Sequence, residues 1–314
     1  MILKGNTMAL DLPSMSDYRE AIEREPACLL DPVLLNGKKP SGTETGTDTA
    51  FYAFGYPGDS GVVYFIKCPS NKFYGIKCFV LRRPEPKHYY AIEDYLKERA
   101  PAFLPQSLKY TDEGIKIKNG HYPVVRMDWI EAVRLDRYLE KNLQNQNSLN
   151  NILKAWISLS QEMRSLGISH GNLEPNNIMI EGGKIRLVDC DTMYVPALEG
   201  ANSPELGNKN FQHPGRKVFH FDANLDNFSD FVIYASILAL SIDPQLWRFV
   251  RLSQHLLFQK SDYEQPESSE VLGLLKTHVD SRVRTLGDTM EELLAGKIEH
   301  VPALSKLQTR FALV

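Results

Sequence analysis

The stretch ISHGNLEPNNIMI, residues 168–180, says more about the fold than any other part of this chain. Its His-Gly-Asn triplet is followed, five residues after the asparagine, by Asn177, and the stretch ends in an apolar run typical of a strand. An EGGK turn and a second apolar run, which ends at Asp189, complete a predicted hairpin. Because Asn177 and Asp189 flank the two strands of one hairpin, their side chains can converge on one ion. Magnesium on a polyphosphate needs a few such oxygen ligands, so we predict a magnesium site at these two residues.

Length and composition are those of an ordinary folded chain. The 314 residues are 43% hydrophobic and 24% charged, which is far from the profile of a disordered protein. The net charge of -3 provides no overall basic field, so we expect no nucleic-acid partner.

No part of the sequence has the pattern of a membrane or secretion segment. The longest apolar run, residues 231–242, is shorter than the roughly 20 residues that a transmembrane helix needs. The first residues have no apolar core of a signal peptide, and the four cysteines show no CxxC spacing. We therefore expect a cytoplasmic protein with no membrane partner.

The chain divides into three predicted parts and belongs to the α+β class. Residues 1–50 form an extension with a short helix at 16–25, capped by Ser16, and a Gly/Thr-rich loop. Residues 51–127 contain short strand-like runs and one helical segment, which predict a small antiparallel sheet with one main helix. Residues 128–314 are mostly helical, because apolar residues recur there at helical spacing. The helices expected in this part cover residues 135–143, 149–168, 226–241, 243–257, 268–279 and 286–296.

Candidates for the other parts of a phosphoryl-transfer site precede the hairpin. Such a site needs a cover for the phosphates, a cation on them, magnesium ligands and a group that orients the acceptor hydroxyl. In YPGDSGVV, residues 56–63, glycines would let backbone amides approach phosphate oxygens. Lys77, 16 residues after Gly61, would supply the cation. An ordinary hairpin turn has the same composition as YPGDSGVV, and Lys77 taken alone could be a solvated strand residue. The prediction therefore depends on the order in which the pieces occur.

Over about residues 51–240, the order and spacing of these pieces resemble the bilobal protein-kinase fold. The MDWI segment, residues 127–130, is similar to the hinge between the two lobes of these kinases, and Asp189-Cys190-Asp191 to their magnesium triplet. Asp226, in LDNFSDFVIY, is similar to the aspartate that opens a buried helix of the large lobe and favours the Ser/Thr kinase branch. The resemblance implies a small sheet lobe with one main helix, a mostly helical large lobe, and ATP and Mg²⁺ as ligands.

The resemblance also implies roles for individual residues. Lys77 would hold the α- and β-phosphates, and Glu93, with Glu98 as the fallback, would pair with it. His170, Asn172 and Glu174 would lie in the catalytic loop. The residues implied for nucleotide binding, from the phosphate lid to the adenine hinge, are Gly58, Gly61, Val63, Lys77, Glu93, Met127, Asp128, Trp129 and Ile130, and those for magnesium are Asn177 and Asp189.

Four departures from the kinase pattern lie in and after the loop. Asn172 replaces the catalytic aspartate and can accept a hydrogen bond from a hydroxyl but not its proton, and such acid-base groups contribute about 10² to 10⁴ in rate. Glu174 replaces a lysine that touches the transferring phosphate and would repel that phosphate. Gly171 replaces an arginine, so no cation is expected there to receive an activation-loop phosphate. HPGR, residues 213–216, lacks the usual acidic residue, and the triplet ends in an aspartate instead of glycine.

The resemblance is therefore to a pseudokinase, which binds ATP and magnesium, transfers phosphate slowly or not at all, and acts in signalling or as a scaffold. One alternative is an active Ser/Thr kinase whose native aspartate has been replaced by Asn172. Another is a small-molecule kinase of the aminoglycoside or choline kinase type, which the His-Gly pair also resembles. A third is an interaction protein whose nucleotide site is filled by its own side chains, such as Tyr56 and Trp129. The sequence does not identify the protein substrate or signalling partner.

Overall fold

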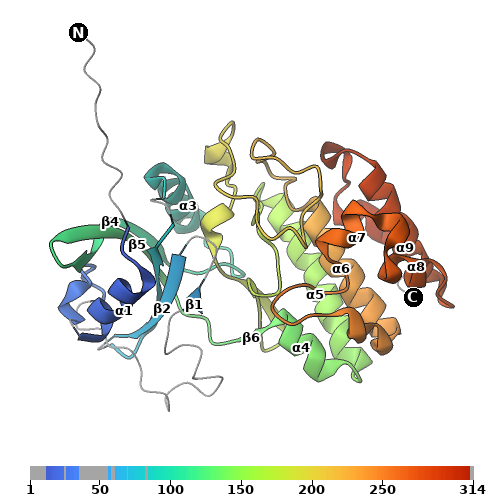
Figure 1. Cartoon of the computed structure of the whole chain (residues 1–314), viewed down its shortest axis with the longest axis horizontal. Coiled ribbons are helices and arrows are strands. Elements are labelled where there is room, and N and C mark those ends of the chain that lie inside the picture. The colour runs from blue at the N-terminus through green and yellow to red at the C-terminus, as the bar shows by residue number, and fades with distance from the viewer. Residues whose placement is uncertain are drawn as a thin grey trace, which may run out of the picture. The chain divides into compact units, whose positions relative to one another are not determined.

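The computed structural model describes residues 12–24, 26–34, 56–57, 61–68, 70–81 and 84–311. The chain divides into two compact units, which we call unit 1 (Met1–Ala100 and Pro105–Trp129) and unit 2 (Pro101–Leu104 and Ile130–Val314). Unit 1 contains an antiparallel sheet with helices and unit 2 is mainly helical (Figure 1), so the expected α+β class is confirmed. Within these described ranges, no helix combines the length and the apolar character needed to cross a membrane.

Unit 1 contains one antiparallel sheet of five strands in the order β1-β2-β3-β5-β4. The β4–β5 hairpin is its longest part and turns at Lys118, whose φ of 55° places it in the left-handed region. The strands are β1 (Tyr56–Pro57), β2 (Gly61–Lys67), β3 (Phe73–Phe79), β4 (Leu108–Ile117) and β5 (Gly120–Asp128).

One face of this sheet is covered by α1 (Met15–Arg24) and the segment that follows it. The Tyr18 side chain of α1 is fully buried, and its hydroxyl donates to the carbonyl of Phe79 at 3.0 Å. In return, the hydroxyl of Tyr64 donates to the carbonyl of Met15 at 2.9 Å. The helix expected in the extension is thus present, but its capping hydroxyl is that of Ser14, which accepts from the Asp17 amide.

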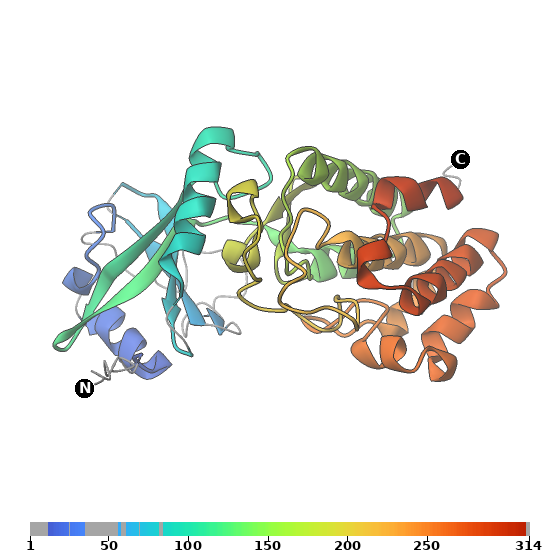
Figure 2. The same ribbon diagram turned by 90° about the horizontal axis from the view of Figure 1, so that it is seen from above.

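Helix α3 (Pro86–Arg99) connects β3 to β4 and is the main helix expected for this sheet. A proline at its first position fits a helix start, because the missing N–H is not needed there. Its buried residues pack on β4, where the rings of Tyr89 and Tyr110 stack with centroids 5.3 Å apart. In Figure 2, α3 lies on the other side of the β4–β5 hairpin from α1.

Unit 2 contains seven α-helices and a three-stranded sheet within its described residues. Its helices are α4 (Leu135–Asn142), α5 (Gln146–Ser165), α6 (Asn227–Ile242), α7 (Lys260–Glu264), α8 (Glu270–Lys276), α9 (Ser281–Ala295) and α10 (Leu304–Leu307). Its strands, β6 (Val133–Arg134), β7 (Ile178–Glu181) and β8 (Lys184–Leu187), include the hairpin predicted from the sequence. The short 3₁₀ helices are η1 (Pro26–Cys28) in unit 1 and η2 (Cys190–Thr192), η3 (Pro196–Leu198), η4 (Pro244–Phe249), η5 (Pro266–Ser268), η6 (Ile298–His300) and η7 (Gln308–Arg310) in unit 2.

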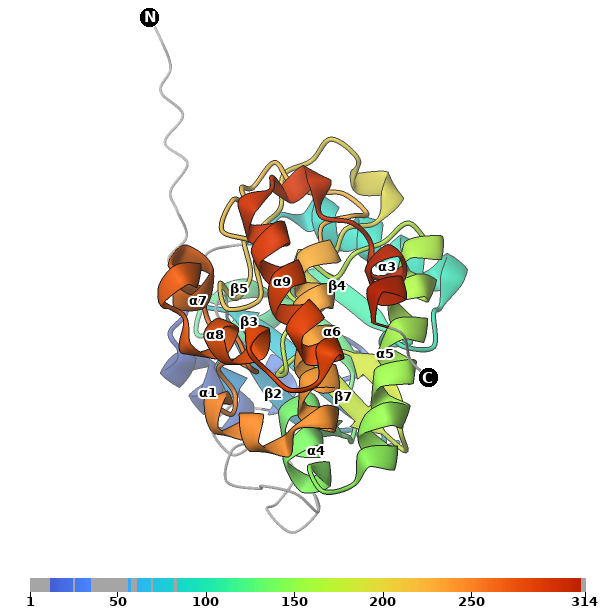
Figure 3. The ribbon, with the colours of Figure 1, turned by 90° about the vertical axis from the view of Figure 1, so that its right-hand side faces the viewer.

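The core of unit 2 is built on α6. Every residue from Phe228 to Ser241 is buried, as expected for a helix that is apolar on all sides. Helix α5 lies beside it (Figure 3), and the indole N–H of Trp156 donates to the carbonyl of Asp230 at 3.1 Å.

The prediction of a helix over residues 243–257 is wrong. Only η4, Pro244–Phe249, is helical there. The chain then turns at Ser253, which has a φ of 62°, and the Ser253 amide donates to the Asp136 carboxylate at 2.7 Å. A contact with a residue 117 positions away therefore overrides the local helical pattern.

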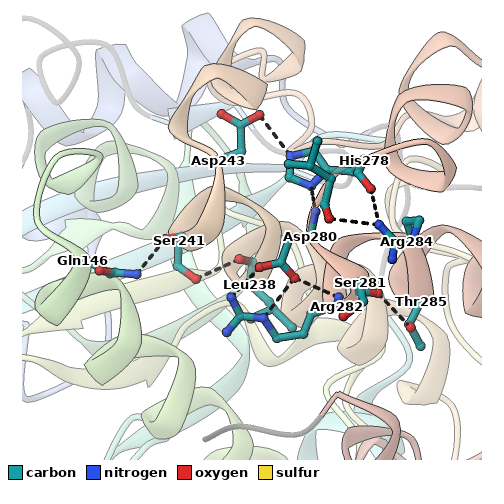
Figure 4. Close-up of polar contacts among 11 residues, drawn as sticks. Gln146, Leu238, Ser241, Asp243, His278, Asp280, Ser281, Arg282, Arg284 and Thr285 are labelled. Carbon is teal, nitrogen blue, oxygen red and sulfur yellow. Dashed lines mark hydrogen bonds and ion pairs between the residues drawn. The ribbon is translucent and has the colours of Figure 1, made fainter.

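Polar contacts fix the start of α9 against the end of α6 (Figure 4). The Asp280 side chain caps α9 by accepting from the Arg282 amide at 2.8 Å. Next to it, His278 lies 3.4 Å from the Asp243 carboxylate, and its backbone carbonyl accepts from Arg284 at 2.6 Å. These bonds satisfy backbone groups that a helix start would otherwise leave unpaired.

Candidate functional site

The loop of residues 168–177 runs between α5 and β7 in unit 2. Its shape depends on Gly171, which has a φ of 79°. A Cβ atom on this residue would lie 2.3 Å from the carbonyl oxygen of Thr192, closer than any side chain tolerates. The glycine at position 171 thus has a local structural cause.

Asp226 holds this loop from the start of α6. Its carboxylate accepts from the backbone amide of His170 and, at 2.9 Å, from that of Gly171. Burial raises the pKa of Asp226, while the nearby His170 and the two amide bonds lower it in part. The sequence expectation that Asp226 opens a buried helix therefore matches its place in the structure.

His170 is fixed by its own neighbours. Its Nε2 lies 2.9 Å from the carbonyl oxygen of Val188, and its Nδ1 accepts from the Asn172 amide at 3.4 Å. Since a carbonyl oxygen only accepts, the His170 Nε2 atom donates to Val188. Both ring nitrogens are thus used to shape the loop.

Arg216 supplies a cation that sequence reasoning missed. Its guanidinium group donates to the carbonyl of Gly171 at 2.8 Å and to the hydroxyl of Ser203 at 3.2 Å. The side chain is only 4% exposed, and burial lowers its pKa to about 10, so it keeps its charge at neutral pH. The sequence expectation that the loop lacks a cation near Gly171 therefore needs correction, because Arg216 reaches it from 45 residues away.

Asn172 contacts a second distant segment through its side chain. Its Oδ1 atom accepts from the backbone amide of Asn208 at 2.8 Å. The Asn208 side chain in turn donates to the Glu174 carboxylate at 2.5 Å. The preceding Gly207 has a φ of 71°, and a Cβ on it would lie 2.8 Å from Asn172 Oδ1, so this approach requires glycine.

This contact limits the expected role of Asn172. The sequence suggested that its side-chain oxygen could accept from an acceptor hydroxyl, and that oxygen already accepts one bond, from the Asn208 amide, which leaves it one lone pair. The orientation also leaves Nδ2, which only donates, as the other polar atom of this side chain.

Asn177 and Asp189 lie at the same end of the β7–β8 hairpin, as predicted. The Asn177 carbonyl accepts from the Val188 amide at 3.0 Å, which brings the two strand ends together. The Asn177 Nδ2 atom donates to the carbonyl of Asn172 at 2.9 Å, so Oδ1 is the side-chain atom that could bind a metal ion. One amide oxygen and one carboxylate fit the oxygen ligands that Mg²⁺ takes alongside phosphates and water. Among the described residues, no group of three or more His, Cys, Asp or Glu could hold a metal ion.

Lys77 lies at the centre of β3 in unit 1, opposite Val63 on β2 and Val125 on β5. Its side chain is only 2% exposed, so the alternative of a solvated strand lysine is wrong. A buried ammonium group must be compensated by polar groups or by a ligand.

The face of the sheet that carries Lys77 also carries two other expected binding residues. A Cβ on Gly75 would lie 3.4 Å from a side-chain carbon of Met127 and 3.4 Å from one of Val63. Sequence reasoning missed Gly75, although a glycine inside a strand often marks the close approach of another group. Side chains of Val63, Met127 and Trp129, the last at 3.7 Å, thus surround a position without a side chain.

Residues of the expected phosphate lid and hinge are only partly described. Gly58 and the side chain of Tyr56 lie outside the described residues. A Cβ on Gly61 would lie 2.2 Å from the Cys78 carbonyl, so glycine is required there by the neighbouring strand.

The hinge amides are used within unit 1. The Asp128 amide donates to the Ser107 carbonyl, and the Trp129 amide donates to the Phe73 carbonyl, both at 3.2 Å. The Trp129 ring packs on that of Phe65. An adenine would therefore have to bind groups other than these two N–H groups.

Glu93 is buried in α3, but the partners found for it are two other lysines. Its carboxylate lies 2.9 Å from the ammonium group of Lys109 and 2.8 Å from that of Lys97. Burial acts to raise the pKa of Glu93, but the two lysines outweigh it and the pKa is lowered. The fallback residue, Glu98, is exposed.

Comparison of the sequence with models of known protein families and with curated proteins gives no match. Each unit is therefore interpreted from its own geometry. Unit 1 contains a buried lysine on a sheet face. Unit 2, taken by itself, contains an anchored loop with an oxygen ligand pair at the end of a hairpin.

Proposed function

We propose that this protein is a kinase-like, ATP- and magnesium-binding protein in which phosphoryl transfer is impaired or absent. The observation that carries the proposal is the bond from the Asn208 amide to Asn172 Oδ1. It occupies one of the two lone pairs of the side-chain oxygen that would orient an acceptor hydroxyl, in a residue that cannot take a proton.

The nucleotide-binding half of the proposal is supported by burial and donor type. Lys77 is a buried cation on a face that it shares with Val63 and Met127, which suits a phosphate next to an apolar base. Asn177 and Asp189 provide the amide and carboxylate oxygens that would hold Mg²⁺. Bound magnesium would neutralise phosphate charge during transfer.

The impairment of transfer is supported by the state of the other polar side chains in the loop. His170 bonds the Val188 carbonyl and the Asn172 amide, and Glu174 bonds the Asn208 side chain. None of these groups replaces the missing base. Its loss alone would slow transfer by about 10² to 10⁴.

The biological role that follows is signalling or scaffolding through ATP-bound and ATP-free states, with a protein partner. The buried Arg216 ties the segment of residues 203–216 to the loop without any phosphate, which fits a protein that activation-segment phosphorylation does not regulate. All four cysteines are free and buried, which fits action in the reducing cytoplasm.

The test is the thermal unfolding of the chain with ATP, with and without Mg²⁺. A ligand at 100 times its dissociation constant stabilises by about 2.7 kcal/mol, so the unfolding midpoint should rise with ATP and magnesium together. Lys77→Met should remove this rise, while Lys116→Met, at an exposed lysine of the same sheet, should keep it. The absence of stabilisation in the native chain, or equal stabilisation of both variants, would contradict the proposal.

A second candidate is the active kinase in which Asn172 replaces a native aspartate. The geometry favours it in one respect, because an aspartate at 172 would keep an oxygen for the Asn208 amide and the loop would not need to change. Sequencing the native gene distinguishes the two candidates, and a silent Asn172→Asp variant would rule out the second.

A further inference from the structure

A small cavity lies in unit 2 between α5 and α6. Ile168 and Leu173, from the loop of residues 168–177, also line it. Its volume of about 30 Å³ has room for a water molecule. The polar residues that line it include Ser160 and Arg164 from α5 and Asp226 and Asp230 from α6. Two carboxyl groups thus share one small cavity in the core of the unit.

Asp230 is the residue that this core does not explain. It lies one helical turn after Asp226, inside a helix whose other buried residues are almost all apolar. The Ser160 hydroxyl donates to its Oδ2 atom. Its Oδ1 atom is buried and has no hydrogen-bond partner among the described residues. A buried carboxylate with an unpaired oxygen is costly, and such groups keep a proton instead.

The charged groups around Asp230 favour the protonated form of its carboxyl group. Asp226, one turn earlier, is itself buried and holds two backbone amides of the loop as a carboxylate. From α5, Arg164 also lines the cavity, but its guanidinium group donates to Asn224 at 3.1 Å. Arg216 acts on Asp226, and the cavity residue nearest α10, Ala303, carries no charge. Burial and the neighbouring Asp226 raise the pKa of Asp230 to about 7.

We propose that the cavity between α5 and α6 is a proton-binding site centred on Asp230, and that its proton controls how firmly Asp226 holds the catalytic loop. With the proton bound, Asp226 is the only negative charge in the cavity and keeps the amides of His170 and Gly171. When the proton leaves, a second negative charge appears one turn away. Water then enters to solvate Oδ1, and the contact between α5 and α6 loosens next to the loop.

The sign of the pH dependence follows from the direction of the shift. The folded chain keeps the Asp230 proton up to about pH 7, whereas an unfolded aspartate releases it near its ordinary pKa of about 3.9. Between these values the folded state binds more protons, so stability falls as pH rises and levels off above about pH 7. The unfolding equilibrium constant should rise by up to about tenfold per pH unit in this window.

The test compares the native chain with Asp230→Asn, which keeps the shape of the side chain but cannot ionise. The native thermal midpoint should fall from pH 5 to pH 8, and exchange of the Gly171 amide, corrected for its intrinsic rate, should become faster. In Asp230→Asn both changes should be reduced. Asp288→Asn, at an exposed aspartate of α9 in the same unit, is the control and should behave like the native chain.

A direct titration keeps the proposal testable if Asp230→Asn does not fold. Carbon NMR of native chain labelled at aspartate carboxyl groups should show one carboxyl that titrates near neutral pH and moves together with the Gly171 amide signal. The proposal is overturned if every aspartate titrates below about pH 5, or if Asp230→Asn keeps the full native pH dependence. These measurements need no nucleotide, so their outcome is independent of the proposed function.

Discussion

Replacing Arg216 by methionine tests whether this buried cation holds the loop of residues 168–177. The substitution keeps much of the apolar stem but removes the guanidinium group, which donates to the Gly171 carbonyl at 2.8 Å and to Gln212 Oε1 at 2.5 Å. It also donates to the Ser203 hydroxyl at 3.2 Å and to the Glu205 carbonyl at 3.4 Å. It also removes the positive charge that acts on the buried Asp226.

The expected loss can be worked out from these contacts. Hydrogen bonds to a charged group contribute about 1.5 to 3 kcal/mol each, and removal of one partner from a buried charged pair costs about 3 to 5 kcal/mol. The Ser203 and Glu205 bonds are long, so we count the Gly171 bond fully and the others in part. Arg216→Met should therefore lower the free energy of unfolding by about 3 kcal/mol.

Urea unfolding measures this loss, and amide hydrogen exchange locates it. Exchange should become faster at residues 170–172, because the loop loses the bond at Gly171. Arg248→Met, at an exposed arginine of the same unit, is the control and should change stability by less than about 0.5 kcal/mol. An equally small effect of Arg216→Met would refute the role given to this side chain.

Two further predictions concern the loop itself. Gly171→Ala should destabilise the chain more than Gly167→Ala in thermal unfolding. Both glycines have positive φ, but a Cβ at Gly171 would lie 2.3 Å from the Thr192 carbonyl, whereas the nearest contact of a Cβ at Gly167 is 3.7 Å. Equal losses of stability would show that the loop adapts. Asn172→Asp should raise phosphate transfer from labelled ATP to the chain or a generic acceptor by about 10² to 10⁴. Asn172→Ala, the control, should show no transfer. An Asn172→Asp variant without transfer would mean that another defect, such as the contact with Asn208, limits the reaction.

Local patterns in the sequence predicted the elements of the fold where local chemistry decides them. The apolar runs around EGGK became the β7–β8 hairpin, and the run of residues 226–241 became the buried helix α6. The helix expected over residues 243–257 failed because the Ser253 amide binds Asp136. Nothing in a local pattern reports such a contact.

At the candidate site, too, local patterns were predicted and distant contacts were missed. The hairpin predicted that Asn177 and Asp189 lie at one end, because two residues that flank a hairpin must do so. Arg216 and Asn208 were missed because they approach the loop from 45 and 36 residues away. HPGR was noted for the acid it lacks, and its arginine is the residue that binds the loop.

Native mass spectrometry of the chain with ATP and Mg²⁺ tests the central claim most directly, because it reports binding and chemistry together. The account predicts a complex whose mass equals the unmodified chain plus intact ATP and magnesium, and its loss in Lys77→Met. A chain that retains no nucleotide, or one that carries ADP and an added phosphate, would contradict it.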